Sequence, residues 1–136
     1  MKRKDFLKQL VSFAPLMVNP SLAVFSKSSN TIIYLLHDFI RGFQYYDGDE
    51  VFESLKEGDS LELIRDFDNK FDRYAIAIYW NGHKLGYVAR EKNNLFAKLM
   101  DADILSFKAK IKKLEGDALS WEQVFYQIYI EKDSDI

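Results

Sequence analysis

The stretch of sequence that decides the fold is Tyr74-Ala75-Ile76-Ala77-Ile78-Tyr79-Trp80-Asn81-Gly82-His83-Lys84-Leu85-Gly86-Tyr87-Val88-Ala89. Large residues alternate with alanine at its start, so Ile76 and Ile78 share one face, which is the period of a β-strand. Asn81-Gly82 is a two-residue turn sequence that requires positive φ, as in many β-hairpins. The sequence therefore predicts a hairpin with strands at 74–80 and 83–89.

Four further segments have the composition of strands. Residues 60–65 and 105–112 alternate apolar with polar side chains, and residues 121–130 place apolar residues at every second position from Val124. Residues 31–41 are apolar on both faces, which predicts a buried first strand.

Between Glu91 and Asp101 the apolar residues change to the period of a helix. The predicted inner face consists of Leu95, Phe96, Leu99 and Met100, and the predicted outer face consists of Lys92, Asn93 and Lys98. A shorter helical turn is predicted between Glu50 and Lys56. Together these segments predict a mainly β fold over residues 31–136, a small six-stranded OB-like β-barrel with one or two short helices.

Composition narrows the function. The chain of 136 residues suits one domain, and it contains no cysteine, which excludes disulfides, thiolate metal sites and cysteine nucleophiles. Residues 1–30 carry five basic residues and one acidic residue, a net charge of +4; because the whole chain is −2, residues 31–136 carry −6. Tight non-specific binding to duplex DNA requires many basic contacts to phosphate. A nucleic-acid ligand would therefore be held in a local pocket, which favours recognition of an end.

The first thirty residues form a separate segment. Arg3-Lys4-Asp5-Phe6-Leu7-Lys8 resembles the twin-arginine export signal, with lysine in place of the second arginine. An apolar run follows at 10–24, and residues 21–23 fit a cleavage site. Proline and asparagine interrupt the run, so stable membrane insertion is not expected. Two readings stay open: an exported, periplasmic protein, or a cytoplasmic one whose N-terminal helix packs on the domain. Residues 26–30 read as a linker.

Three blocks join aromatic and polar residues at the predicted strand junctions. They are Gly42-Phe43-Gln44-Tyr45-Tyr46-Asp47-Gly48, then Arg65-Asp66-Phe67-Asp68-Asn69-Lys70-Phe71-Asp72-Arg73-Tyr74-Ala75-Ile76, then Leu85-Gly86-Tyr87-Val88-Ala89-Arg90. Flat rings can stack on a nucleobase, and the neighbouring polar atoms can bind a sugar or a phosphate.

In order and spacing, the blocks resemble the HIRAN domain, a module that grips single-stranded DNA ends in helicase-like, fork-remodelling ATPases. The resemblance implies that Tyr45 and Phe71 sandwich a terminal base and that Asp72 contacts the free 3′-hydroxyl. It also implies that sugar and phosphate contacts come from Asn69, Tyr87 and Arg90. Gln44, Tyr46 and Lys70 complete the predicted nucleic-acid-binding set.

Several residues depart from the family pattern. Gln44 stands where end-binding members carry an arginine, which removes one charge-assisted phosphate contact. Lys70 replaces a proline and partly compensates as a flexible point charge. Phe71 replaces a tyrosine and keeps the stacking face, and Tyr74 stands at a position that is often asparagine.

Each site residue also has a structural interpretation. Tyr45 and Tyr46 can cap the barrel, and Asn69 and Asp72 are residue types that stabilise turns through their own backbone. Gly42, Gly48 and Gly86 fit backbone geometry better than ligand contact. A basic stripe on one predicted strand, at Lys108, Lys110 and Lys112, is explained by a solvated face.

The leading functional hypothesis is a non-enzymatic module that recognises single-stranded DNA 3′ ends or similar nucleotide termini and needs no cofactor. The alternative is an exported barrel that binds another ligand or a protein and has no role with DNA. A nuclease using Asp66, Asp68 and Asp72 is the weakest hypothesis, because these residues form no metal-ligand motif.

Overall fold

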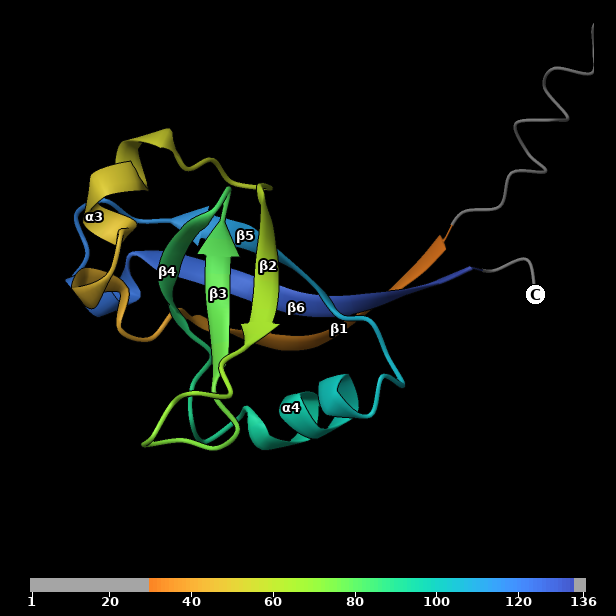
Figure 1. The fold of residues 1–136 in the computed structure, drawn as a ribbon. Helices are drawn as coiled ribbons and strands as arrows, with labels where there is room; N and C mark the ends of the chain where they lie inside the picture. The colour runs from red at the N-terminus through yellow and green to blue at the C-terminus, as the bar shows by residue number, and fades with distance from the viewer. Residues whose placement is uncertain (1–29, 134–136) are drawn as a thin grey trace, which may run out of the picture. The chain divides into compact units, whose positions relative to one another are not determined.

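The computed structural model describes residues 30–133, and the compact unit within it runs from Ile32 to Glu131. Six strands form one sheet in the order β1-β6-β5-β2-β3-β4 (Figure 1). The strands are β1 (Asn30–Phe39), β2 (Ser60–Arg65), β3 (Ile76–Trp80), β4 (His83–Tyr87), β5 (Lys108–Leu114) and β6 (Val124–Asp133). The helices are α3 (Gly48–Val51) and α4 (Asn94–Asp101), with 3-10 turns at Phe43–Tyr45, Phe52–Ser54 and Ser120–Glu122. The predicted mainly β fold with short helices is confirmed, whereas the predicted export signal lies outside the described residues.

The β3–β4 hairpin is the one that the sequence predicts. Asn81 and Gly82 take φ values of 48° and 85°, and the strands pair antiparallel with a bulge after Ile78. Both faces of β3 are covered, because Ala77 is buried as fully as Ile76 and Ile78. Small and large residues therefore pack on opposite sides of a strand that lies inside the fold.

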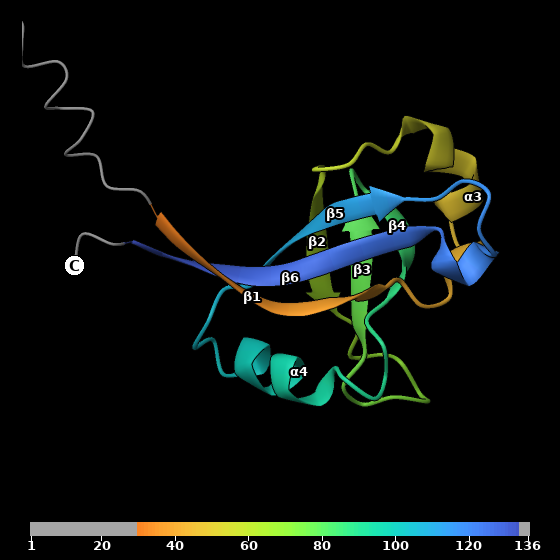
Figure 2. The same cartoon turned by 180° about the vertical axis from the view of Figure 1, so that it is seen from behind.

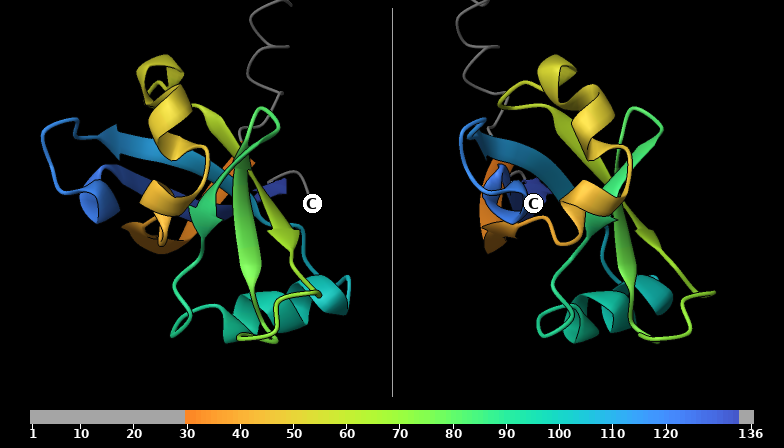
Figure 3. Two further views of the ribbon diagram at one scale, coloured as in Figure 1. Left: turned by 60° about the vertical axis from the view of Figure 1, so that its left-hand side comes forward. Right: turned by 90° about the vertical axis from the view of Figure 1, so that its left-hand side faces the viewer.

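The sheet bends at β2 instead of closing into a barrel. Ser60 and Leu61 pair with β5, whereas Glu62 to Arg65 pair with β3. Figure 3 shows the two halves as separate layers, with β2, β3 and β4 in one and β5, β6 and β1 in the other. The core fills the space between the layers with Ile76, Ile78, Leu85, Ile111, Val124, Tyr126 and Ile128.

One isolated bridge joins the two edges of this sheet. Arg41, just after β1, and Tyr87, at the end of β4, each donate a backbone N–H to the other's carbonyl oxygen, at 2.9 and 2.8 Å. Gly86 makes this approach possible, because a Cβ at that position would overlap the carbonyl oxygen of Arg41. The glycine of the third block therefore serves the backbone, as the sequence predicts.

The prediction of a buried first strand is wrong. Ile32, Ile33, Tyr34 and Leu35 are all exposed, because β1 is an edge strand with β6 as its only neighbour in the described sheet. Figure 2 shows β1, β6 and β5 side by side across the back of the fold. Apolar residues on both faces of a strand thus do not establish a central position.

The predicted faces of α4 are also partly wrong. Leu95 is exposed, and the fully buried residue of the helix is Ala97, with Phe96 and Met100 packed against the core. Asn93, predicted to face solvent, is only 1% exposed. Asn93 is buried because its side-chain amide donates a hydrogen bond to Asp72, a residue of the candidate site.

Candidate functional site

The loop between β2 and β3, residues 66–75, carries most of the predicted site and is held at its base by Arg65. Nη1 of Arg65 donates to the carbonyl oxygen of Ala75 at 2.6 Å, and Nη2 donates to that of Arg73 at 3.0 Å. The same guanidinium donates to both carboxylate oxygens of Asp101 on α4, at 2.9 and 3.1 Å. A planar fork of five donors suits this role better than an ammonium. Arg65 therefore ties both ends of the loop to α4.

Inside the loop, Asn69 forms the turn. Its Oδ1 accepts the backbone N–H groups of Phe71 at 2.9 Å and Asp72 at 3.1 Å. This is the turn chemistry expected of asparagine. The amide oxygen of Asn69 is thus committed to the backbone, and its amide nitrogen is the group left for a ligand.

Asp72 is fixed by two hydrogen bonds. Its Oδ1 accepts the backbone N–H of Tyr74 at 2.9 Å, and its Oδ2 accepts Nδ2 of the buried Asn93 at 2.8 Å. An ionised carboxylate offers about four lone-pair positions, so about two remain for a ligand. The aspartate is therefore oriented in advance and still able to accept.

The ring of Phe71 next to it is exposed. Phe71 is 84% exposed, and Tyr45, on the 3-10 turn Phe43–Tyr45, is 75% exposed. No ring contact among residues 30–133 involves either side chain. These two rings face solvent, whereas Phe43, on the same turn as Tyr45, is buried in the core.

A hollow of about 470 Å³ opens beside Phe71. It joins the loop to the segment before α4, and its lining is Lys70, Phe71, Asp72, Arg73, Tyr74, Arg90, Asn93 and Asn94. Four predicted residues, Lys70, Phe71, Asp72 and Arg90, thus come together. Among residues 30–133, neither Lys70 nor Arg90 forms an ion pair.

Tyr46 and Tyr87 form a second cluster. Their ring centroids are 5.8 Å apart, and Nζ of Lys84 lies 4.5 and 4.4 Å from the two centroids. Lys84 donates to the hydroxyl of Tyr87 at 2.7 Å, and that hydroxyl donates to Oδ2 of Asp66. The hydroxyl of Tyr87 thus links β4 to the start of the loop.

These contacts shift two pKa values. Burial and the hydrogen bond to Asp66 raise the pKa of Tyr87, against a smaller lowering by Lys84. Burial lowers the pKa of Lys84, but the hydrogen bond to Tyr87 and the nearby tyrosines outweigh it, and the net pKa is raised. At neutral pH the cluster holds a neutral hydroxyl beside a charged ammonium.

The predicted site residues that do not line the hollow beside Phe71 are Gln44, Tyr45, Tyr46, Asn69 and Tyr87. Gln44 belongs to the same 3-10 turn as Tyr45, and its Oε1 is buried without a hydrogen-bond partner among residues 30–133. Sequence reasoning missed Arg65, Lys84 and Asn93 as supports of the site. Arg65 is the first residue of the second block, and this position could have indicated its role. The contacts of Lys84 and Asn93 join segments that are distant in the sequence, so no local pattern indicates them.

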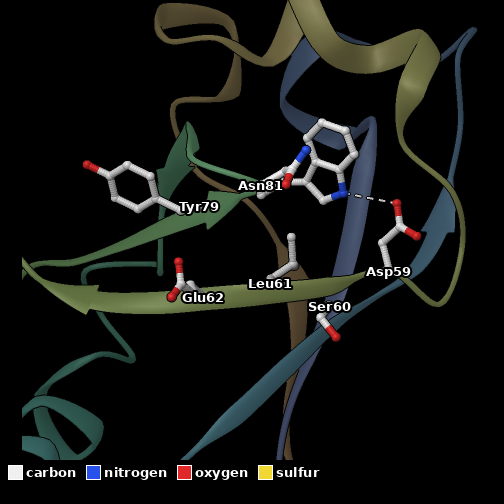
Figure 4. Close-up of a pocket in the computed structure, with 7 residues that line it drawn as sticks. Asp59, Ser60, Leu61, Glu62, Tyr79 and Asn81 are labelled. Carbon is white, nitrogen blue, oxygen red and sulfur yellow. Dashed lines mark hydrogen bonds between the residues drawn. The ribbon is translucent and has the colours of Figure 1, made fainter.

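Another hollow, of about 410 Å³, contains none of the predicted residues. It lies between the start of β2 and the end of β3, where Nε1 of Trp80 donates to Oδ2 of Asp59 at 3.0 Å (Figure 4). Across residues 30–133, no three His, Asp or Glu side chains are grouped to hold a metal ion. None of the helices between residues 30 and 133 has the length and apolar composition needed to cross a membrane.

Comparison with known proteins identifies the fold. Residues 33–133 match the HIRAN domain family. A crystal structure of a protein from Lactobacillus plantarum is similar, with 24% identity and a TM-score of 0.63 over 76% of this chain and 99% of that one. The crystal structure of the HIRAN domain of human HLTF is also similar, with 18% identity and a TM-score of 0.59 over 76% and 82% of the two chains. No curated protein is significantly similar to the chain.

Proposed function

Because the chain belongs to the HIRAN domain family, we propose that it binds nucleic acid and that its ligand is the 3′ end of a single strand or a similar nucleotide terminus. The observation that carries this proposal is the pairing of an exposed ring with an oriented carboxylate. Phe71 is 84% exposed, and the adjacent Asp72 is held by the amide of Asn93.

Phe71 supplies a stacking surface for the terminal base, and Tyr45 is the second ring of the sandwich. Base–aromatic stacking contributes roughly 1–3 kcal/mol per base and tolerates any sequence. The 3-10 turn of Tyr45 and the loop of Phe71 are linked through Tyr46, Tyr87 and Asp66. This linkage supports a common site for the two rings.

Asp72 reads the free hydroxyl. Its unused lone pairs accept a hydrogen bond from a 3′-OH, while its negative charge repels a phosphate at the same place. Arg90 and Lys70, which line the same hollow, supply the positive charge for the phosphodiester that precedes the last nucleotide. An end with a free hydroxyl is therefore preferred over an internal linkage.

Fluorescence anisotropy with 5′-labelled single-stranded oligonucleotides tests the proposal. The full chain is expected to bind a 3′-hydroxyl end about tenfold more tightly than a 3′-phosphate end, the ratio that about 1.4 kcal/mol produces. Asp72→Asn keeps the shape and removes the charge, so it should reduce that ratio. Equal affinity of the unsubstituted chain for the two ends would refute recognition of the hydroxyl.

A further inference from the structure

A row of aromatic rings lies on the outer side of the β1-β6-β5 layer, away from the core. In β6, Val124, Tyr126 and Ile128 are buried in the core, so the alternate residues Phe125, Gln127 and Tyr129 lie on the opposite face. Gln127 is itself buried there, with its amide nitrogen 3.2 Å from Nδ1 of His37. Figure 2 views the fold from this side. The outer aromatic face is defined here as Tyr34, His37, Phe39, Phe125 and Tyr129 together with Lys108 and Lys110.

The rings of this face contact one another in a continuous row. Phe39 and Phe125 are 5.1 Å apart between centroids, and His37 stacks on Phe125 at 6.3 Å. Tyr34 then lies 5.7 Å from His37 and 5.8 Å from Tyr129. The planar groups thus come from two neighbouring strands, β1 and β6, and Tyr34 remains 44% exposed.

Lysines of β5 border the row. Lys108 lies directly opposite Tyr129 in the β5–β6 pairing, and its ammonium pairs with Glu131 at 2.6 Å. Nζ of Lys110 lies 5.6 Å from the ring centroid of Tyr34 and 5.2 Å from that of Tyr129. No carboxylate within residues 30–133 pairs with Lys110. Its charge therefore stays available above two flat rings.

The row ends in a hollow on each side. One, of about 380 Å³, is lined by Tyr129 and Lys108 together with the first four residues of β2, including Glu62. The other, of about 330 Å³, is lined by Phe39 and Phe125 together with Lys113, Glu115, Ala118 and Glu122. The lysines that line the two hollows, Lys108 and Lys113, are paired with Glu131 and Glu115. Contact with phosphate is therefore expected at Lys110, beside Tyr34 and Tyr129.

We propose that the outer aromatic face is a second binding surface, for single-stranded nucleic acid held by base stacking. Planar rings beside lysine are the combination that holds single strands without reading their sequence. A phosphodiester suits Lys110, because this ammonium lies over two rings and no carboxylate within residues 30–133 pairs with it. Stacking on a face needs no terminus, so the surface is independent of end recognition at Asp72.

Circular single-stranded DNA tests this surface, because a circle has no end to enter the loop site. The full chain is expected to bind the circle, and Tyr34→Leu, which keeps apolar bulk but removes the ring, is expected to weaken that binding about fivefold to tenfold. Lys110→Gln should reduce the slope of log affinity against log salt by about 0.7, the value for one phosphate contact with a single strand. Lys56→Gln, at an exposed lysine outside this face, is the matched control, and it should change neither quantity.

The outcomes separate the two binding sites. Binding of the circle that resists Phe71→Ala and falls with Tyr34→Leu supports the outer face, whatever the linear ends do. Failure of the circle to bind, while linear 3′-hydroxyl strands do bind, overturns the outer face and leaves end recognition intact. Sedimentation equilibrium gives a second refutation: a dimer of the unsubstituted chain that Tyr34→Leu converts to a monomer would make this face a self-association surface.

Discussion

The loop at 66–75 and the outer aromatic face both present aromatic side chains to solvent, but they hold them in opposite ways. In the loop, polar groups of Arg65, Asn69 and Asp72 fix the backbone, and the ring of Phe71 contacts no other ring of the part of the chain that the structure describes. On the outer face the rings fix one another, and the polar groups lie at the border. Replacing Phe71 should therefore change the free energy of unfolding little. Each ring of the outer aromatic face, by contrast, also stabilises its neighbours, so replacing one should lower that free energy.

The largest effect should come from removing the polar frame of the loop. Arg65→Ala is expected to lower the free energy of unfolding by about 2 kcal/mol, because two carbonyl groups and Asp101 lose their donor. Urea denaturation of the full chain measures the change. Arg65→Lys retains the charge without the fork and should recover only part of the loss. A loss under about 0.5 kcal/mol, typical of plain surface substitutions, would show that the loop does not depend on Arg65.

Substituting one ring from each region, Phe71 and Tyr34, compares their effects on stability and on binding. Phe71→Ala should leave stability within about 0.5 kcal/mol yet weaken binding of a 3′-hydroxyl end by about 1–3 kcal/mol. Tyr34→Leu should lower stability by about 0.2–1 kcal/mol, since it removes cross-strand aromatic contacts. Thermal denaturation and anisotropy on the same preparations provide both numbers. Equal stability losses would remove the distinction between a free ring and a supporting ring.

A smaller effect is expected at the polar residue that the helical pattern misassigned. Asn93→Ala removes the donor to Asp72 and should cost about 1 kcal/mol of stability. It should also reduce the preference for a 3′-hydroxyl over a 3′-phosphate, because the carboxylate loses its fixed orientation. Leu95→Ala, at an exposed position of α4 that does not line the hollow, is the control and should change neither value. A full preference in the Asn93 variant would mean that Tyr74 alone orients the aspartate.

The smallest effect concerns pH and the Tyr87 cluster. The pKa of Tyr87 is raised in the folded chain, so its hydroxyl contributes stability below its ordinary pKa of 10.0 and loses that contribution as pH rises through the folded value. The raised pKa of Lys84 acts with the same sign. The difference in unfolding free energy between the unsubstituted chain and Tyr87→Phe should therefore be constant near neutral pH and shrink above about pH 10. A difference that grows with pH would contradict this assignment.

Local patterns predicted the strands well and the long-range contacts poorly. Residues 60–65 match β2 because alternation and turn residues are local signals. Edge and central strands look alike when both faces are apolar, which is why β1 was misplaced. Asn93 was assigned to solvent because polarity alone does not reveal a partner 21 residues earlier in the chain. The three blocks predicted the site residues of the loop, and their role in binding stays a prediction. The supports at Asp101 and Lys84 depend on the folded geometry.

The Arg41–Tyr87 bridge joins the two segments that carry the candidate site. Arg41 leads directly into the turn that carries Tyr45, and Tyr87 reaches the loop of Phe71 through Asp66. The two backbone amides of this bridge should therefore exchange their hydrogens together, at a rate set by parting of the sheet edges and slower than that of a frayed end. A ligand bound between the rings of Tyr45 and Phe71 would slow the hydrogen exchange of both amides. The exchange rate of these two amides would therefore report how often the two segments of the site separate.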